Sequence, residues 1–237
     1  MKCLGLIGGD GLGATLSYHR QLMEEIQHRW GEHCAANLVS FGLHTPEFAL
    51  LIDQGRKHQL AKLLSTVAGH LRALGAEAIV LCSPSLHICA DRIGARIPII
   101  HMVDPTIDAL RRARVNRLGI IGLRHNDEER MWRESCRRAH IIDVLMPVPR
   151  DREKIAYIIQ EELQRGIVRD SSRAALVGII HTLRQAGARA LVLASPELDL
   201  ALLEAAPILP VYKASELHVL AALDWASHAK EAAPASA

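Results

Sequence analysis

Cys82 is the residue whose type and setting best suit proton transfer or nucleophilic attack. It ends an apolar run, residues 78–82, and the polar sequence SPS that follows is typical of a helix start. A thiol at a helix N-terminus lies near unpaired backbone N–H groups and the positive end of the helix dipole, and both lower its pKa. The resulting thiolate can act as a nucleophile or as a base toward a C–H proton. The alternative is a buried structural cysteine.

An internal repeat supplies a second loop of the same kind. Residues 71–86 read LRALGAEAIVLCSPSL and residues 183–198 read LRQAGARALVLASPEL, so ten of sixteen positions are identical at an offset of 112. Two shorter segments, LGLIG and LGIIG, match at nearly the same spacing. We therefore expect a duplicated chain in which two related lobes face each other. In that arrangement Cys82 faces the equivalent loop, residues 194–197, which reads ASPE.

A glycine-rich loop that holds Gly9 and Asp10 follows the first apolar run. Its pattern, G-x-G-x-x-A, satisfies the dinucleotide-binding fingerprint. Two features argue against a nucleotide. No acidic residue ends the next expected strand, where a ribose would be held, and Asp10 places negative charge where a pyrophosphate would lie. The loop has two other interpretations. It is either a plain strand-to-helix turn or a site where backbone N–H groups hold a small anion.

Strands and helices that alternate along the chain must position these loops. Strands are expected at residues 2–7, 37–41, 78–82, 98–101, 117–121, 141–145, 190–193 and 208–212. Helices are expected at residues 15–29, with Thr15 as N-cap, and at 57–74, 85–93, 127–139, 152–164, 171–185 and 215–227.

Such alternation indicates an α/β fold of mostly parallel sheets flanked by helices. We expect two pseudo-symmetric lobes, residues 1–103 plus 213–237 and residues 104–212. Ligands of parallel α/β sheets bind beyond the carboxyl ends of the strands, so the active-site cleft is expected between the lobes.

The amino-acid composition argues against nucleic acid and membranes as binding partners. Of the 237 residues, 49% are apolar, enough for a sizeable core. A net charge of +2 and an aromatic content of 3% give neither a basic surface nor a stacking platform for nucleic acid. No apolar run reaches the ~20 residues of a membrane span, so we expect no membrane partner.

Cysteines and histidines indicate a metal-free protein of the cytoplasm. The five cysteines are an odd number without a C-x-x-C pair, and no secretory signal precedes the first expected strand. We therefore expect reduced thiols and a cytoplasmic location. The 13 histidines show no ligand-pair spacing of the H-x-x-x-H kind, so no metal site is expected.

Five segments carry a resemblance to a known family. They are GLIGGDGLGAT (5–15), VLCSPSLHICAD (80–91), PIIHMVDPT (98–106), RGIVRDSSRAA (165–175) and SELHVLAALDWA (215–226). Together they resemble the aspartate/glutamate racemase superfamily over nearly the whole chain. The resemblance implies two similar α/β lobes, no cofactor and usually a homodimer. It also implies two catalytic thiols, one per lobe: one thiolate removes the α-proton, and the opposing thiol returns a proton to the other face.

The chain departs from the family at both catalytic motifs. The family's C-T-N-T is CSPS here, which keeps Cys82 but puts Pro84 where an asparagine helps to hold the substrate carboxylate. The family's G-C-T-E is ASPE, so Ser195 stands where the second thiol is expected. A serine hydroxyl is a far weaker acid than a thiol, and the local sequence indicates no base for it. The family's Gly-Thr pair is Gly122-Leu123, which removes another polar contact.

The resemblance thus assigns the catalytic positions to Cys82 and Ser195. The substrate-binding residues are expected to be Gly9, Asp10, Ser83, Ser85, Arg165 and Glu197. The expected function is a cofactor-independent amino-acid racemase or epimerase in amino-acid metabolism, acting on a small carboxylate or amino-acid substrate. Two alternatives stay open: a catalytically inactive homologue that binds a small carboxylate or a partner, and a one-thiol lyase, isomerase or decarboxylase.

Overall fold

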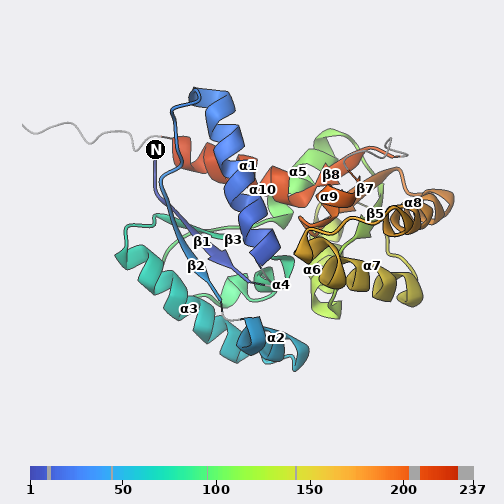
Figure 1. Ribbon diagram of the computed structural model, residues 1–237, viewed down its shortest axis with the longest axis horizontal. Helices are drawn as coiled ribbons and strands as arrows, with labels where there is room; N and C mark the ends of the chain where they lie inside the picture. The colour runs from blue at the N-terminus through green and yellow to red at the C-terminus, as the bar shows by residue number, and fades with distance from the viewer. Residues whose placement is uncertain (10–11, 44, 95, 142, 203–208, 229–237) are drawn as a thin grey trace, which may run out of the picture.

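Two parallel sheets, each flanked by helices, form the protein in a computed structural model (Figure 1). The structure describes residues 1–9, 12–43, 45–94, 96–141, 143–202 and 209–228. Asp10 and the tail from residue 229 lie outside this part of the chain.

The first sheet has the strand order β2-β1-β3-β4, and every neighbouring pair is parallel. Its strands are β1 (Leu4–Gly8), β2 (Leu38–Gly42), β3 (Ala78–Leu81) and β4 (Ile99–Ile100). Strands β1 and β3 are buried along their whole length, which explains why both are continuous apolar runs rather than alternating ones.

The second sheet repeats this order as β6-β5-β7-β8, again with parallel neighbours. Its strands are β5 (Arg117–Ile121), β6 (Asp143–Leu145), β7 (Ala190–Leu193) and β8 (Val211–Lys213). Both sheets thus place their first strand between the second and third. The matching order confirms the predicted α/β fold with two related lobes.

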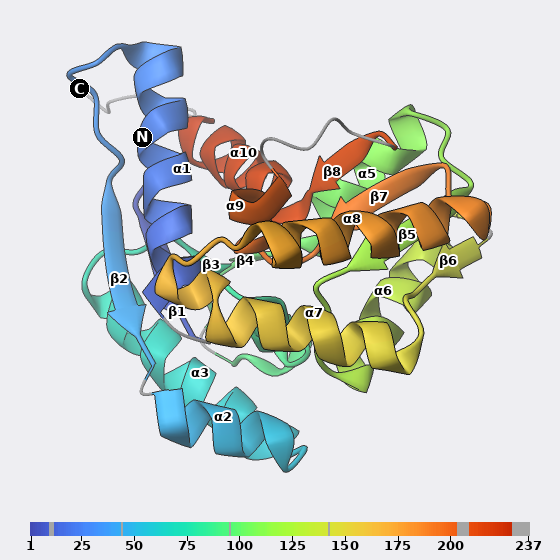
Figure 2. The same ribbon diagram turned by 45° about the vertical axis from the view of Figure 1, so that its right-hand side comes forward.

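Helices cover both faces of each sheet. They are α1 (Leu12–Trp30), α2 (Thr45–Asp53), α3 (Lys57–Ala73), α4 (Pro84–His87), α5 (Val103–Arg112), α6 (Asn126–Arg138), α7 (Pro149–Glu161), α8 (Asp170–Gln185), α9 (Leu198–Leu202) and α10 (Ala214–Ser227). Two 3₁₀ turns, η1 (Ala90–Arg92) and η2 (Leu163–Arg165), complete the described elements. Helices α7 and α8 run together along one face of the second sheet, as α2 and α3 do on the first (Figure 2).

The central core lies between the two sheets and joins the lobes. Apolar residues of both sheets meet there with the inner faces of α1, α5, α6 and α10. Helix α5 packs on α6, α10 packs on α1, and α5 and α10 pack on each other (Figure 1). The helix that follows each sheet therefore contributes to a core shared by both lobes, which ties the lobes together.

Three helices, α2, α5 and α9, lie outside the ranges expected from sequence. Helices α2 and α5 each carry a proline in the first turn, Pro46 and Pro105. Proline is tolerated there because the first backbone N–H groups of a helix have no partner within it. Helix α1 begins at Leu12, before the expected start, so Thr15 lies inside the helix instead of capping it. A Cβ at Gly8 would clash with Oγ1 of Thr15, so glycine lets β1 and α1 approach closely.

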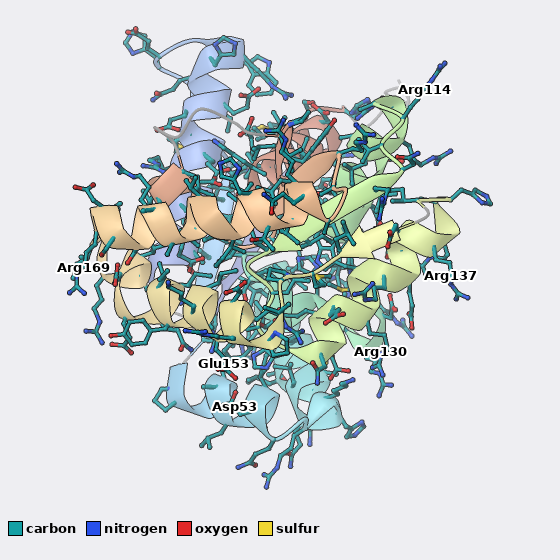
Figure 3. All side chains as sticks on the ribbon, turned by 90° about the vertical axis from the view of Figure 1, so that its right-hand side faces the viewer. Asp53, Arg114, Arg130, Arg137, Glu153 and Arg169 are labelled. Atoms are coloured by element: carbon teal, nitrogen blue, oxygen red, sulfur yellow. The ribbon has the colours of Figure 1, made fainter. Side chains whose placement is uncertain are left out.

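Charged side chains of both signs point outward from the helices. Asp53, Arg130, Arg137, Glu153 and Arg169 all extend away from the ribbon (Figure 3). Along the described residues, no helix combines the length and the apolar character needed to cross a membrane.

Candidate active site between the lobes

The repeated loops of the two lobes meet at a small polar pocket, which we call the interlobe pocket. Lobe one contributes Ser83, Pro84 and Ser85, which follow β3. Residues after β5 and β7 close the opposite side: Gly122, Arg124, Glu128, Ser195, Pro196 and Glu197. The pocket measures about 20 Å³, which is room for about one water molecule. The lobes are thus closed on each other in this structure.

Ser195 forms a hydrogen-bonded pair with Glu197 on the lobe-two side. The Ser195 hydroxyl donates to Glu197 Oε2 at 2.5 Å, and both side chains are buried. Sequence reasoning found no base for this serine, and the structure corrects that: a carboxylate two residues along the chain accepts a hydrogen bond from its hydroxyl. Gly122 makes room for the turn, since its φ is +93° and a Cβ there would lie 2.9 Å from the Ser195 backbone nitrogen.

A second serine–carboxylate pair joins the two lobes. Ser85 donates to Glu128 Oε1 at 2.5 Å, and Glu128 is almost fully buried. The other oxygen of Glu128 accepts the Arg124 backbone N–H at 2.8 Å. Sequence reasoning missed both Arg124 and Glu128. The position of Arg124, three residues beyond β5 at the carboxyl edge of the sheet, was the available signal.

Cys82 directly follows β3 inside the shared core, and its side chain does not line the interlobe pocket. It is 0% exposed, and its Sγ lies 3.9 Å from the Val80 carbonyl oxygen. Burial raises the pKa of the Cys82 thiol far above its usual value. The sequence predicted a lowered pKa from a helix N-terminus. That prediction was wrong for this conformation, because α4 has only four residues and desolvation dominates.

The remaining predicted residues are distributed unevenly. Four of them, Ser83, Ser85, Ser195 and Glu197, line the same pocket. Gly9 is buried within lobe one, where an added Cβ would lie 3.3 Å from the ring of Phe48. Asp10 lies outside the described residues. Arg165 is exposed and pairs with Glu161 at 2.8 Å, so its side chain is engaged away from the pocket.

A family model for Asp/Glu/hydantoin racemases matches residues 7–222 of this chain. The chain belongs to the Asp/Glu/hydantoin racemase family. A solved structure of a candidate Asp/Glu racemase from Yersinia pestis is 31% identical, with a TM-score of 0.84, and the match covers 95% of this chain and 99% of that one. The resemblance inferred from the motifs is thereby confirmed.

More distant solved structures share the fold. An aspartate racemase homologue from Pyrococcus horikoshii OT3 is 23% identical with a TM-score of 0.80, over 96% of this chain and all of that one. Glutamate racemase from Francisella tularensis, solved in complex with D-glutamate, is 13% identical with a TM-score of 0.68, over 94% and 80% of the two chains. Family and fold agree with the two-lobe architecture.

Three histidines of this racemase-family chain cluster together. The His87 ring contacts those of His101 and His218, with centroids 4.5 and 5.3 Å away. His218 Nε2–H donates to the Ile100 carbonyl at 2.7 Å, so Nδ1 accepts the Tyr18 hydroxyl at 2.8 Å. Burial lowers the pKa of His218 to about 4, which keeps it neutral. Within the described residues, no group of three His, Cys, Asp or Glu side chains could hold a metal ion.

Proposed function

We propose that this protein is a cofactor-independent racemase or epimerase of amino acids, with Cys82 as the α-proton base and Ser195 in the opposing position. The observation that carries the proposal is the interlobe pocket of a racemase-family chain. Equivalent loops of the two lobes form its opposite walls, with serines 83 and 85 on one side and Ser195 on the other. Racemisation needs such a two-sided site, because a proton leaves one face of the α-carbon and returns to the other.

Substrate must enter a more open state than the one described. A pocket of about 20 Å³ cannot hold an amino acid, so the lobes have to separate. Separation would bring water and substrate to the end of β3, where Cys82 lies. Rehydration of the thiol removes the desolvation that raises its pKa, and the fraction of reactive thiolate then increases.

The proton path follows from the groups on each side. The Cys82 thiolate takes the α-proton and becomes a thiol, and the electron pair stays on the substrate as a carbanion. The Ser195 hydroxyl then gives its proton to the opposite face. This leaves an alkoxide on Ser195, which takes up a proton from solvent through Glu197, 2.5 Å from its oxygen. The Cys82 thiol releases the α-proton to solvent when the lobes open. We propose that Arg124, which lines the pocket, holds the substrate carboxylate in place of the distant Arg165.

A second candidate is a family member that binds a small carboxylate without turnover. The observation that favours it is the complete burial of Cys82 in a neutral form, outside the lining of the pocket. If the lobes open too little to expose the sulfur, the pocket retains polar groups for a ligand but has no base for the α-proton.

Exchange of the α-hydrogen in heavy water separates these functions. Wild-type protein and the Cys82→Ala variant are incubated with L- and D-aspartate, L- and D-glutamate and a panel of other amino acids, and deuterium is followed by NMR. Catalysis predicts exchange with inversion in the wild type and its loss in the variant. Absence of exchange with every amino acid rejects the racemase in favour of binding. Exchange with retained configuration indicates one-sided chemistry at Cys82, as in a one-thiol enzyme.

Two further features belong to the same proposal. Thiol, hydroxyl and carboxyl groups suffice for the proton transfers, so we propose that activity needs no cofactor and survives treatment with a chelator and exhaustive dialysis. We also propose a homodimer, in line with the family. Analytical ultracentrifugation of the purified chain tests the dimer, and a monomer at assay concentration contradicts it.

A further inference from the structure

A second hollow, which shares no lining residue with the interlobe pocket, lies between α1 and α10. It measures about 480 Å³, large enough for a small organic molecule. Its deepest charged group is Asp199 of α9, and Gln21 of α1 and Glu216 of α10 contribute to its walls. We call it the Asp199 hollow. The proposed racemase chemistry uses none of these side chains.

Two residues that line the hollow each carry a buried hydrogen-bond acceptor without a partner. Asp199 is only 7% exposed, and its Oδ1 is hydrogen-bonded to no group of the described chain. Gln21 donates through Nε2 to Ser17 Oγ at 2.9 Å, yet its Oε1 is buried without a partner as well. Buried polar atoms are nearly always satisfied in folded proteins. Two unsatisfied acceptors in one hollow therefore call for a ligand that donates hydrogen bonds.

The charges around the hollow also favour a cation. Its lining carries four carboxyl groups and two Lys or Arg side chains. Both of these cations already have carboxylate partners other than Asp199, since Arg20 pairs with Glu24 at 3.8 Å and Lys213 with Glu216 at 3.5 Å. Glu25 pairs at 2.6 Å with Arg29, which lies outside the lining. Asp199 is thus the one carboxyl group of the lining without an ion-pair partner in the described structure, and a ligand with one positive charge would balance it.

We propose that the Asp199 hollow binds a small organic cation through a primary ammonium group that donates hydrogen bonds to Asp199 Oδ1 and Gln21 Oε1. A primary ammonium carries three donors, so one group can satisfy both acceptors. Charge-assisted hydrogen bonds of this kind are roughly twice as strong as neutral ones. The 480 Å³ volume leaves space for a short alkyl chain that carries this ammonium group.

The duplicated fold supplies an internal comparison. The repeat offset of 112 places His87 at the position equivalent to Asp199, and the strand registers place His101 at that of Lys213. A hollow of about 330 Å³ is lined by His87 and by residues of α6, just as the Asp199 hollow is lined by Asp199 and by residues of α1. There Glu134 takes the place of Arg20. The His87 hollow offers an imidazole in place of the buried carboxylate, so it provides a matched control.

Isothermal titration calorimetry with putrescine, 1,4-diaminobutane, tests the proposal on the intact protein. Saturable binding at one site is expected, together with a loss of about tenfold or more in affinity for Asp199→Asn. Glu134→Gln, in the His87 hollow, is expected to change the affinity by less than about twofold. Near-ultraviolet circular dichroism checks that both variants are folded.

A neutral analogue distinguishes specific recognition from general attraction. 1,4-Butanediol has the same chain length without ammonium groups, and we expect no measurable binding of it. Absence of putrescine binding, an unchanged affinity in Asp199→Asn, or an equal loss in both variants would each overturn the proposal. None of these outcomes depends on amino-acid racemisation, so the hollow and the proposed function succeed or fail separately.

Discussion

The Ser85 hydroxyl donates a 2.5 Å hydrogen bond to Glu128 Oε1, and this contact joins lobe one to the first turn of α6 in lobe two. The neighbouring residue of α6, Asp127, forms an ion pair with Lys57 of α3 at 2.6 Å. Two polar contacts between the lobes are therefore made by consecutive residues of one helix turn. We regard this turn as the latch that holds the interlobe pocket closed.

Removing the Ser85 hydroxyl is expected to open the latch. Ser85→Ala leaves a buried oxygen of Glu128 without this donor, which costs about 1–3 kcal/mol of stability. The separated lobes then expose Cys82, so its alkylation by iodoacetamide, followed by peptide mass spectrometry, becomes faster. Ser227→Ala, which loses only an exposed hydrogen bond to Asp224, is the control and should leave the rate unchanged. Equal alkylation rates in Ser85→Ala and wild type would show that Ser85 does not close the site.

Restoring a second thiol is expected to accelerate racemisation. Ser195→Cys replaces a weakly acidic hydroxyl with a group that returns protons more readily. Loss of one of two coupled catalytic groups commonly costs several orders of magnitude, so a gain of about tenfold or more is expected. Polarimetry with the best substrate from the exchange panel measures the rate. Ser195→Ala should be slower than wild type, and a Ser195→Cys variant no faster than Ser195→Ala would refute the opposing role of residue 195.

Asp199 should make the folded protein less stable as the pH rises. Burial is the main cause that raises the Asp199 pKa from 3.8 to about 7, and the charge of Lys213 opposes it. The folded state therefore binds this proton more tightly than the unfolded state does. Its stabilising effect is complete below about pH 4 and is lost as the pH rises to about 7. A shift of this size corresponds to about 4 kcal/mol.

The Asp199→Asn variant isolates this contribution. Because asparagine does not titrate, the variant should gain stability over wild type as the pH is raised from 4 to 7, by up to about 4 kcal/mol. Urea unfolding of both proteins at several pH values gives the difference. His218 has the opposite effect on stability, because its lowered pKa makes the folded state more stable as the pH rises toward 6.5. Both proteins contain His218, so this effect cancels in the difference. A difference that is independent of pH would contradict the assignment.

The buried Tyr18–His218 hydrogen bond is expected to stabilise the packing of α1 on α10. Tyr18→Phe keeps the ring but leaves His218 Nδ1 without its donor in a fully buried place, which costs about 1–3 kcal/mol. Thermal or urea unfolding measures the loss. Tyr157→Phe is the matched control because that side chain is 58% exposed, and it should have little effect. Equal stabilities for the two variants would mean that the hydrogen bond contributes nothing.

Much of the architecture could be predicted from the sequence because it depends on local pattern and on the repeat. Apolar runs that end in glycine marked β1 and β5, and the match of residues 71–86 with 183–198 predicted two related lobes. Because ligands of parallel α/β sheets bind beyond the strand ends, the sequence predicted that Ser85 and Ser195 line one pocket, and they do. Helices α2 and α5 were missed, since a proline near their start masks the helical pattern.

The sequence alone determined the duplicated α/β fold, the family and the positions of the two facing loops, because these follow from residue order and short-range spacing. Tertiary structure decided the state of each group in those loops. Both the sequence and the structure place Cys82 at the end of an apolar strand segment. Its thiol is neutral because core residues from distant segments of both lobes bury it. The partners of Ser85 and the unsatisfied oxygens of the Asp199 hollow also arise from helices far away in the chain. Burial and charge pairing are sums over such distant neighbours, and no local pattern contains them.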